Sequence, residues 1–296
     1  MRLALAVLLL ALAFRPAAAD APRIVVSIKP LHGLVAALLE GLAKPELLLE
    51  GEATPHAFTL KPSARQALQR AGVVVWIGPG MEEFLVKPLS VLPDRVRTVA
   101  LMQETPDLRL LPLAETHGGD HHAGDGDAHD PHIWLSLSNA RRIAAYLAKV
   151  FAPLVPARQL EANALVLDQK LVALDRKIAA RLAPVRDRPF VVFHPAYNYF
   201  VEAYGLRQVG VLALSPTIGA SARHLGDVRE AVVAGQAICA FREPQFSERA
   251  VAGLVRGAGL RQGVLDPLGA SVPAGPAAYQ LTLSGLTDML VDCLTP

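Results

Sequence analysis

The stretch PARQLEANALVLDQKLVALDRKIAARL, residues 156–182, decides the fold of this chain of 296 residues. Its apolar residues recur every three or four positions, at Leu160, Ala164, Leu167, Leu171, Leu174, Ile178 and Leu182. This spacing predicts one amphipathic helix about 40 Å long, at 1.5 Å per residue. The apolar face would be either a coiled-coil seam between copies of the chain or a spine on which two lobes pack. The central position of the stretch favours the spine.

Short apolar segments alternate with helical segments on both sides of this helix. Before it, strands are predicted at residues 23–28, 46–49, 73–77 and 97–101, with helices at 31–42 and 62–71. After it, strands are predicted at residues 190–193, 207–212, 237–241 and 263–265. Such alternation is typical of βαβ units. The predicted fold class is therefore α/β, with two lobes of mainly parallel sheet joined by one long rigid helix.

The first nineteen residues have the layout of a secretory signal peptide. Arg2 precedes an apolar run at residues 3–14, and Ala17 to Ala19 offer an A-x-A cleavage site. A membrane helix is the alternative, but the run of twelve residues is shorter than the roughly twenty that a bilayer core requires. No later segment is long and apolar enough to span a membrane. The predicted organisation is a signal peptide at 1–19, an amino-terminal lobe at 20–153, a linking helix at 154–185 and a carboxy-terminal lobe at 186–296.

Composition and charge exclude several classes of protein. Hydrophobic residues make up 52% and charged residues 19% of the chain, which excludes disorder. Cleavage near Ala19 removes Arg2 and Arg15 and leaves 27 basic against 27 acidic residues. A mature chain without net charge is not expected to bind nucleic acids through nonspecific electrostatic attraction.

Export also changes the interpretation of the two cysteines, Cys239 and Cys293. In an oxidising compartment a disulfide is the leading interpretation. In the cytosol the leading interpretation would be two unrelated buried thiols. A bridge between them would close a loop of 54 residues. The chain-entropy model gives such a bridge about 4 kcal/mol of stabilisation.

Five of the nine histidines fall between residues 117 and 132. The segment ETHGGDHHAGDGDAHD, residues 115–130, has no apolar residue larger than alanine, so we expect a mobile loop rather than a part of the core. Its imidazoles and carboxylates favour weak, exchangeable binding of a zinc-class metal, and a polar linker is the alternative. The accessory histidines of this loop are His117, His121, His122 and His129.

Three other histidines occupy more constrained positions. His56 and His194 follow predicted strands, where ligands bind in open parallel sheets, and His132 lies where the histidine-rich loop ends. Each alone would more often be an ordinary structural histidine. Together, in loops that face each other across two lobes, they form a coherent metal set. Three imidazoles suit zinc and leave a fourth position open.

The remaining polar candidates are weaker. His32 and His224 are isolated, and we expect helix-start or surface positions for them. Glu82 and Glu83 follow the predicted turn at residues 78–80, where a solvated helix start is the leading interpretation and a place in the cleft is the alternative.

Six segments carry a resemblance to a known family. They are SIKPLH (27–32), PHAF (55–58), DPHIWL (130–135), FHPAY (193–197), EPQF (243–246) and LDPLG (265–269). In this order they resemble the periplasmic zinc-binding proteins of bacterial high-affinity zinc ABC importers, the ZnuA type, over about residues 23–294. The resemblance implies a monomer in the periplasm that holds Zn²⁺ in the cleft between its lobes. It also implies delivery to a membrane permease driven by an ATPase, and no catalytic residue.

The resemblance further implies the ligands. His56 and His132 would come from the amino-terminal lobe and His194 from the carboxy-terminal lobe. Asp266 matches an aspartate ligand of the wider family, although water can take its place in the zinc members. Some relatives carry a glutamate where this chain has Pro55, and its absence strengthens the case for Asp266.

The same resemblance bears on the cysteines and on the metal. Cys239 and Cys293 match the paired cysteines of the zinc branch, which supports a disulfide. Manganese- or iron-binding members of the family tend to present two histidines and two carboxylates, with a glutamate where this chain has His194. A zinc-dependent hydrolase is a further alternative, but it needs a carboxylate base, as in H-E-x-x-H, and that motif does not occur here.

Overall fold

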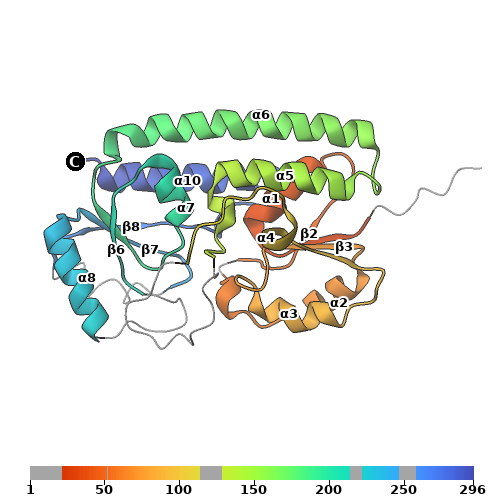
Figure 1. The fold of residues 1–296 in the computed structure, drawn as a ribbon, viewed down its shortest axis with the longest axis horizontal. Coiled ribbons are helices and arrows are strands. Elements are labelled where there is room, and N and C mark those ends of the chain that lie inside the picture. Colours follow the sequence, from red (N-terminus) through yellow and green to blue (C-terminus); the bar gives the residue numbers. More distant parts are fainter. Residues whose placement is uncertain (1–21, 52, 114–128, 214–221, 247–257) are drawn as a thin grey trace, which may run out of the picture.

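The computed structural model describes residues 22–51, 53–113, 129–213, 222–246 and 258–296. The predicted signal peptide and residues 115–128 of the histidine-rich segment lie outside this part of the chain. Two α/β lobes lie side by side beneath one long helix, α6 (Ala157–Leu182), which runs across the top of Figure 1. The predicted fold class is confirmed.

Each lobe contains a four-stranded parallel sheet. The strand order is β2-β1-β3-β4 in the amino-terminal lobe and β6-β5-β7-β8 in the carboxy-terminal lobe. The strands are β1 (Ile24–Val26), β2 (Glu46–Leu47), β3 (Val73–Trp76), β4 (Arg97–Ala100), β5 (Phe190–Val192), β6 (Gln208–Val211), β7 (Cys239–Arg242) and β8 (Arg261–Val264). Ile24 pairs with Val73, and Phe190 pairs with Cys239, so each sheet is built around a central pair of strands. Every residue of β3 is buried, as expected for a parallel strand covered on both faces.

Helices cover both faces of these sheets (Figure 1). Besides α6 they are α1 (Lys29–Leu38), α2 (Pro62–Arg70), α3 (Glu83–Ser90), α4 (Leu101–Glu104), α5 (Leu137–Phe151), α7 (Asn198–Tyr204), α8 (Ala222–Gly235) and α10 (Ala278–Leu294). The described residues also form short 3-10 helices, namely η1 (Pro55–Ala57), η2 (Ile133–Leu135) and η3 (Ala183–Val185). Pro62 begins α2, where its missing N–H costs no helical hydrogen bond.

The apolar face of α6 is used within the molecule. The buried residues of the helix are Leu160, Leu167, Leu171, Leu174, Ile178 and Leu182, all members of the predicted stripe. They face α1, α5 and α10, and α6 packs along all three of these helices. The spine interpretation of the stripe is therefore confirmed.

The two lobes also meet directly, because α1 of the first lobe packs against α10 of the second. At Gly33 the helices are so close that an added Cβ would lie 2.5 Å from the backbone nitrogen of Tyr279. One hydrophobic core runs through this contact, and it includes Leu34 of α1 and Leu283 of α10. A close-packed interface of this kind holds the lobes in a defined relative position.

A disulfide joins Cys239 in β7 to Cys293 in α10, with Cα atoms 6.2 Å apart. This confirms the predicted pairing. The bridge ties the last helix to a central strand of the second sheet and closes the loop between them, which supports about 4 kcal/mol of stabilisation in the chain-entropy model.

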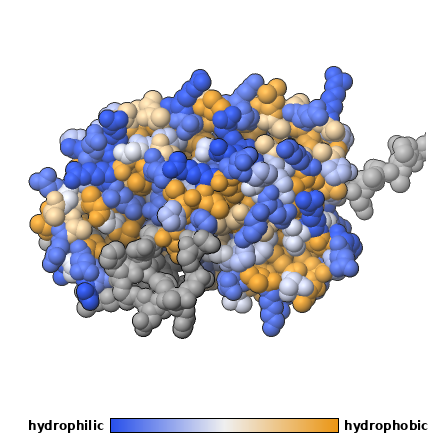
Figure 2. Space-filling view, in the orientation of Figure 1, coloured by the Kyte–Doolittle hydropathy of each residue, from blue (hydrophilic) through white to orange (hydrophobic). Residues whose placement is uncertain are grey.

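The visible surface carries polar and apolar side chains interspersed (Figure 2). An apolar patch lies at the lower right of this view, over α2 and α3 (Figure 2). Val86 in α3 and Val91 directly after it are exposed. Within the described ranges, no helix has both the length and the apolar character that crossing a membrane requires.

Candidate metal centre

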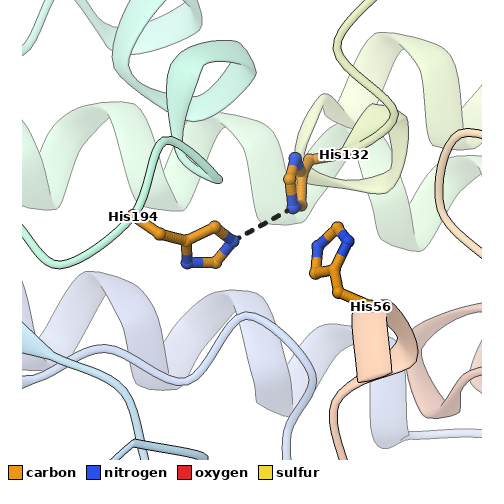
Figure 3. Close-up of side chains that lie close together, drawn as sticks. All are labelled: His56, His132 and His194. Carbon is orange, nitrogen blue, oxygen red and sulfur yellow. Dashed lines mark hydrogen bonds between the residues drawn. The ribbon is translucent and has the colours of Figure 1, made fainter. Parts of the chain in front are cut away.

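Three histidines from separate segments meet between the lobes. His56 follows β2 in the first lobe, His194 follows β5 in the second, and His132 directly precedes η2 (Figure 3). One ring nitrogen from each lies within 4.8 Å of the others. The three side chains that the sequence predicts as metal ligands are thus brought together by the fold.

The backbone around His56 is fixed by a short capped turn. Thr54 is the N-cap of η1, and its Oγ1 accepts a hydrogen bond from the backbone N–H of His56 at 3.4 Å. Pro55 follows at the first position of the turn, where its fixed φ suits the helical geometry. The sequence Thr-Pro-His therefore holds the imidazole at the end of a rigid loop that points into the space between the lobes (Figure 3).

Asp130 positions His132. Its Oδ1 accepts hydrogen bonds from the backbone N–H of His132 at 3.0 Å and from the ring Nδ1 at 2.7 Å. The carboxylate is held in turn by the amide of Asn198, whose Nδ2 donates to Oδ2 at 2.9 Å. Because an ionised carboxylate only accepts, Nδ1 carries the hydrogen, and in the neutral ring of His132 the other nitrogen has a free lone pair.

Glu243 does the same for His194. It follows β7, the neighbour of β5, and its Oε1 accepts a hydrogen bond from Nδ1 of His194. Both side chains are buried, at 3% and 4% exposure. A carboxylate behind the imidazole fixes the tautomer and raises the basicity of the nitrogen that faces a metal.

The free nitrogens of these two rings face each other. Nε2 of His132 lies 3.3 Å from Nε2 of His194, the contact dashed in Figure 3. With both Nδ1 atoms engaged, two lone pairs point into one space, so a proton or a cation is needed between them. Two nitrogens bound at 2.0–2.1 Å to a tetrahedral ion lie about 3.3 Å apart. The observed separation therefore fits a single small ion.

The space at the cluster has room for one small particle. The cavity has a volume of about 10 Å³ and is lined by Thr54, Pro55, His56, Met81, His132, Trp134, His194, Glu243, Gln245, Pro267 and Leu268. That volume is near the minimum required to hold one water molecule. A site of this size suits a single ion.

The cavity also keeps one imidazole neutral. The pKa of His56 is lowered from 6.5 to about 3, first by burial and then by the neighbouring His132 and His194. A neutral imidazole is the form that binds a metal ion. The same crowding that disfavours a proton on His56 thus leaves its lone pair available near neutral pH.

Asp266 lies outside this cluster. Its carboxylate accepts backbone hydrogen bonds from Leu268 at 3.2 Å and from Ala270 at 2.5 Å, which closes a turn after β8. Lys29 of the other lobe donates to the carbonyl oxygens of Gly269 and Ala270 at 2.6 and 2.8 Å. In this structure the aspartate shapes the loop that forms one wall of the cavity.

The other candidates have structural positions. His129 is exposed and forms an isolated antiparallel bridge with Pro112, whereas His117, His121 and His122 lie outside the described residues. His32 is buried near the start of α1, and its Nε2 lies 3.1 Å from the carbonyl oxygen of Pro45. Of the two expected positions, His32 therefore occupies the helix start and not the surface.

The expected solvated position is wrong for Glu82. It is fully buried rather than solvated, and its carboxylate accepts hydrogen bonds from Ser27 Oγ at 2.6 Å and from the backbone of Ile77 and Gly78. Burial raises its pKa to about 7 against the lowering effect of these donors. Glu82 joins the ends of β1 and β3, because three buried donors there need an acceptor. Only Glu83 begins the helix at an exposed position.

Sequence reasoning assigned no role to Asp130, Glu243 or Gln245. The signal for Glu243 was available, since it follows a predicted strand at the same edge as His194. Asp130 stands two residues before a predicted ligand, the spacing at which an aspartate accepts a backbone N–H. Gln245 carries no such local signal, because only the folded cavity places it beside the histidines.

The fold and the site together define a class of protein. Two parallel α/β lobes, a helix across both and a histidine centre of single-ion size between them are the features of a two-lobed solute-binding protein with a metal-type site.

This chain belongs to the ZnuA family. The family model described as "Zinc-uptake complex component A periplasmic" matches residues 24–293. The chain is similar to the high-affinity zinc uptake system protein ZnuA of Brucella suis, with 36% identity over 308 residues, covering 92% of this chain and 91% of the relative. It is 33% identical over 292 residues to the protein of the same name from Yersinia pestis, again covering 92% and 91%. A crystal structure of ZnuA superposes with a TM-score of 0.79 at 26% identity, covering 93% of this chain and 100% of that one.

Proposed function

We propose that this protein captures Zn²⁺ in the periplasm and delivers it to an ABC-type zinc importer. The observation that carries the proposal is the convergence of His56, His132 and His194 around a cavity of about 10 Å³. Two of the imidazoles are buried and backed by carboxylates, the arrangement that zinc-binding histidines commonly have.

The ligand set that we propose is three histidines and one water molecule. Three protein ligands with an open fourth position are a common arrangement for accessible zinc sites. We assign the fourth position to water rather than to Asp266, because both carboxylate oxygens of Asp266 are already bonded to backbone N–H groups. An ion held by three neutral imidazoles and water can also leave, as a carrier requires.

The relatives support the remaining parts of the proposal. Those from Brucella suis and Yersinia pestis are both named as high-affinity zinc uptake proteins. We infer from them that the partners are a permease and its ATPase, and that residues 1–19 direct export to the periplasm. The monomeric state, the proposed lobe boundaries and metal contact by the histidine-rich loop remain predictions.

Two alternatives are less well supported by the site. A manganese or iron carrier would favour oxygen ligands, whereas the cluster presents three imidazoles. A zinc-dependent hydrolase would need a free carboxylate base beside the bound water. Asp130 and Glu243, the carboxylates that contact the histidines, both accept hydrogen bonds from ring nitrogens. Turnover of an ester, peptide or phosphate substrate that chelation abolishes would support the hydrolase.

The proposal is tested by competitive titration of the mature protein with zinc and manganese against a chromophoric chelator. Zinc should be preferred, and alanine at His56, His132 or His194 should each greatly weaken its binding. His224→Ala is the matched control, since His224 lies on α8 outside the cluster. Deletion of residues 117–129 should leave the tight site intact. Tight binding that survives the three alanine variants but not the deletion would refute the site.

A further inference from the structure

One polar side chain in the metal cavity has no partner to account for its burial. Gln245 lines the same cavity as the three histidines. Both of its amide atoms, Oε1 and Nε2, are buried and lack a hydrogen-bond partner among the described residues. Leaving a buried polar group unpaired costs about 1–3 kcal/mol, so an amide in this position points to a ligand.

The other lining side chains of the cavity are either apolar or engaged. Trp134 donates its Nε1–H to the carbonyl oxygen of Pro267 at 2.9 Å. Glu243 is bonded to His194, and the hydroxyl of Thr54 accepts from the backbone of His56. The apolar lining comes from Pro55, Met81, Pro267 and Leu268. Apart from the histidines, Gln245 is therefore the described lining side chain whose buried polar atoms make no hydrogen bond.

The backbone holds Gln245 next to a ligand. The segment of residues 243–246 turns directly after β7, where the N–H of Phe246 donates to the carbonyl of Glu243 at 3.1 Å. The ring of Phe246 packs against Phe193 at 4.5 Å and against His194 at 6.0 Å between centroids. One tight turn thus carries both the carboxylate behind His194 and the unpaired amide.

We propose that Gln245 is a positioning residue for bound zinc. Its carboxamide hydrogen-bonds the water molecule that completes the coordination of the ion at the position left open by the three histidines. This inference rests on the proposed function. A metal-bound water is a strong donor, and the amide oxygen is an acceptor that carries no charge. A neutral partner orders the water without adding the oxygen ligand that would favour manganese.

The test replaces Gln245 by methionine, which keeps the length of the side chain but removes the amide. Zinc dissociation constants are measured by chelator competition. Loss of one such hydrogen bond should weaken binding about threefold to tenfold. Gln245→Glu, which retains an acceptor, should bind zinc at least as tightly as the wild type. Gln208→Met is the matched control, because Gln208 in β6 also has a buried amide oxygen without a partner but does not line the cavity.

A second measurement separates a role at the metal from a role in folding. Cobalt(II) replaces zinc, and its visible absorption is followed as a function of pH, since the spectrum reports the coordination and ionisation of the bound water. Gln245→Met should change the spectrum and displace its pH midpoint by about half a unit or more, because hydrogen bonds at an ionising group shift its pKa. Gln208→Met should leave the midpoint unchanged.

The outcomes distinguish this inference from the function on which it rests. Wild-type protein that fails to bind zinc would overturn both. Wild-type protein that binds zinc tightly while Gln245→Met binds within twofold of it would overturn the role of Gln245 alone. Weaker binding with an unchanged cobalt spectrum and pH midpoint would show a structural role only, and would also overturn the proposal.

Discussion

Replacing Glu243 should weaken zinc binding in two steps, one for its charge and one for its hydrogen bond. Glutamine at this position keeps an oxygen that can accept from Nδ1 of His194 but removes the negative charge. Alanine removes both. The pair of variants therefore separates the electrostatic contribution of the carboxylate from its role in orienting the imidazole.

The burial of the pair determines the expected size of the effect. Loss of the carboxylate behind a zinc-binding histidine typically lowers affinity about 10- to 100-fold. Glu243 and His194 are only 3% and 4% exposed, so water cannot readily replace the lost partner. We expect Glu243→Ala to approach the 100-fold end, about 2.7 kcal/mol, and Glu243→Gln to lie near tenfold, about 1.4 kcal/mol.

The measurement is chelator competition at pH 7 and physiological salt. Glu230→Gln is the control, because it removes the same charge from an exposed position on α8 in the same lobe. Urea unfolding of the zinc-free proteins establishes that each variant folds. Zinc affinity of Glu243→Ala within twofold of the wild type would refute the reasoning. So would an equal loss in Glu230→Gln, since the effect would then belong to net charge.

Three further predictions follow from other parts of the structure. Because the pKa of His56 is lowered to about 3, the unfolded chain takes up a proton below pH 6.5 while the folded zinc-free protein does not. Because of this residue, the free energy of unfolding in urea should be about 2 kcal/mol lower at pH 5 than at pH 7. His56→Gln should lose less stability over this pH range, and an equal loss in both proteins would contradict the prediction. Replacing Cys239 and Cys293 by serine should lower the free energy of unfolding, measured in urea, by about 4 kcal/mol. The reduced wild-type protein should be as stable as the variant. A loss below about 1 kcal/mol would be inconsistent with the closed loop of 54 residues. Gly33→Ala should lower the free energy of unfolding by about 1–3 kcal/mol, because the added Cβ would lie 2.5 Å from a backbone nitrogen of α10. Gly285→Ala is the control, because its added Cβ meets nothing within 4 Å. Similar unfolding midpoints for the two variants would refute the close contact.

Much of the site could be found from sequence because its ligands stand at recognisable positions. His56 and His194 follow short apolar strands, and the carboxyl ends of parallel strands are where ligands bind. His132 lies next to the histidine-rich segment but does not depend on it. The histidine-rich segment thus indicated a metal-binding protein, but of the histidines in and beside it only His132 belongs to the buried cluster.

The partners of the ligands were harder to predict, because they depend on which strands become neighbours. Glu243 is 49 positions from His194 in the chain, and only the pairing of β5 with β7 brings them together. Asp266 shows the opposite case, since the resemblance to the family suggested it as a ligand. The fold instead directs its carboxylate to backbone N–H groups of its own turn.

The sequence by itself determined the α/β class, the long amphipathic helix at residues 156–182 and which three histidines to consider as metal ligands. These features follow from local periodicity and from residue chemistry, which act over a few positions of the chain. Only the tertiary structure decided that α1 and α10 meet at Gly33 and that the buried carboxylate of Glu82 joins the ends of β1 and β3. It also decided that Gln245 lines the metal cavity without a hydrogen-bond partner. Such contacts join residues far apart in the chain, so they are set by how the two sheets pack against the helices rather than by any local pattern.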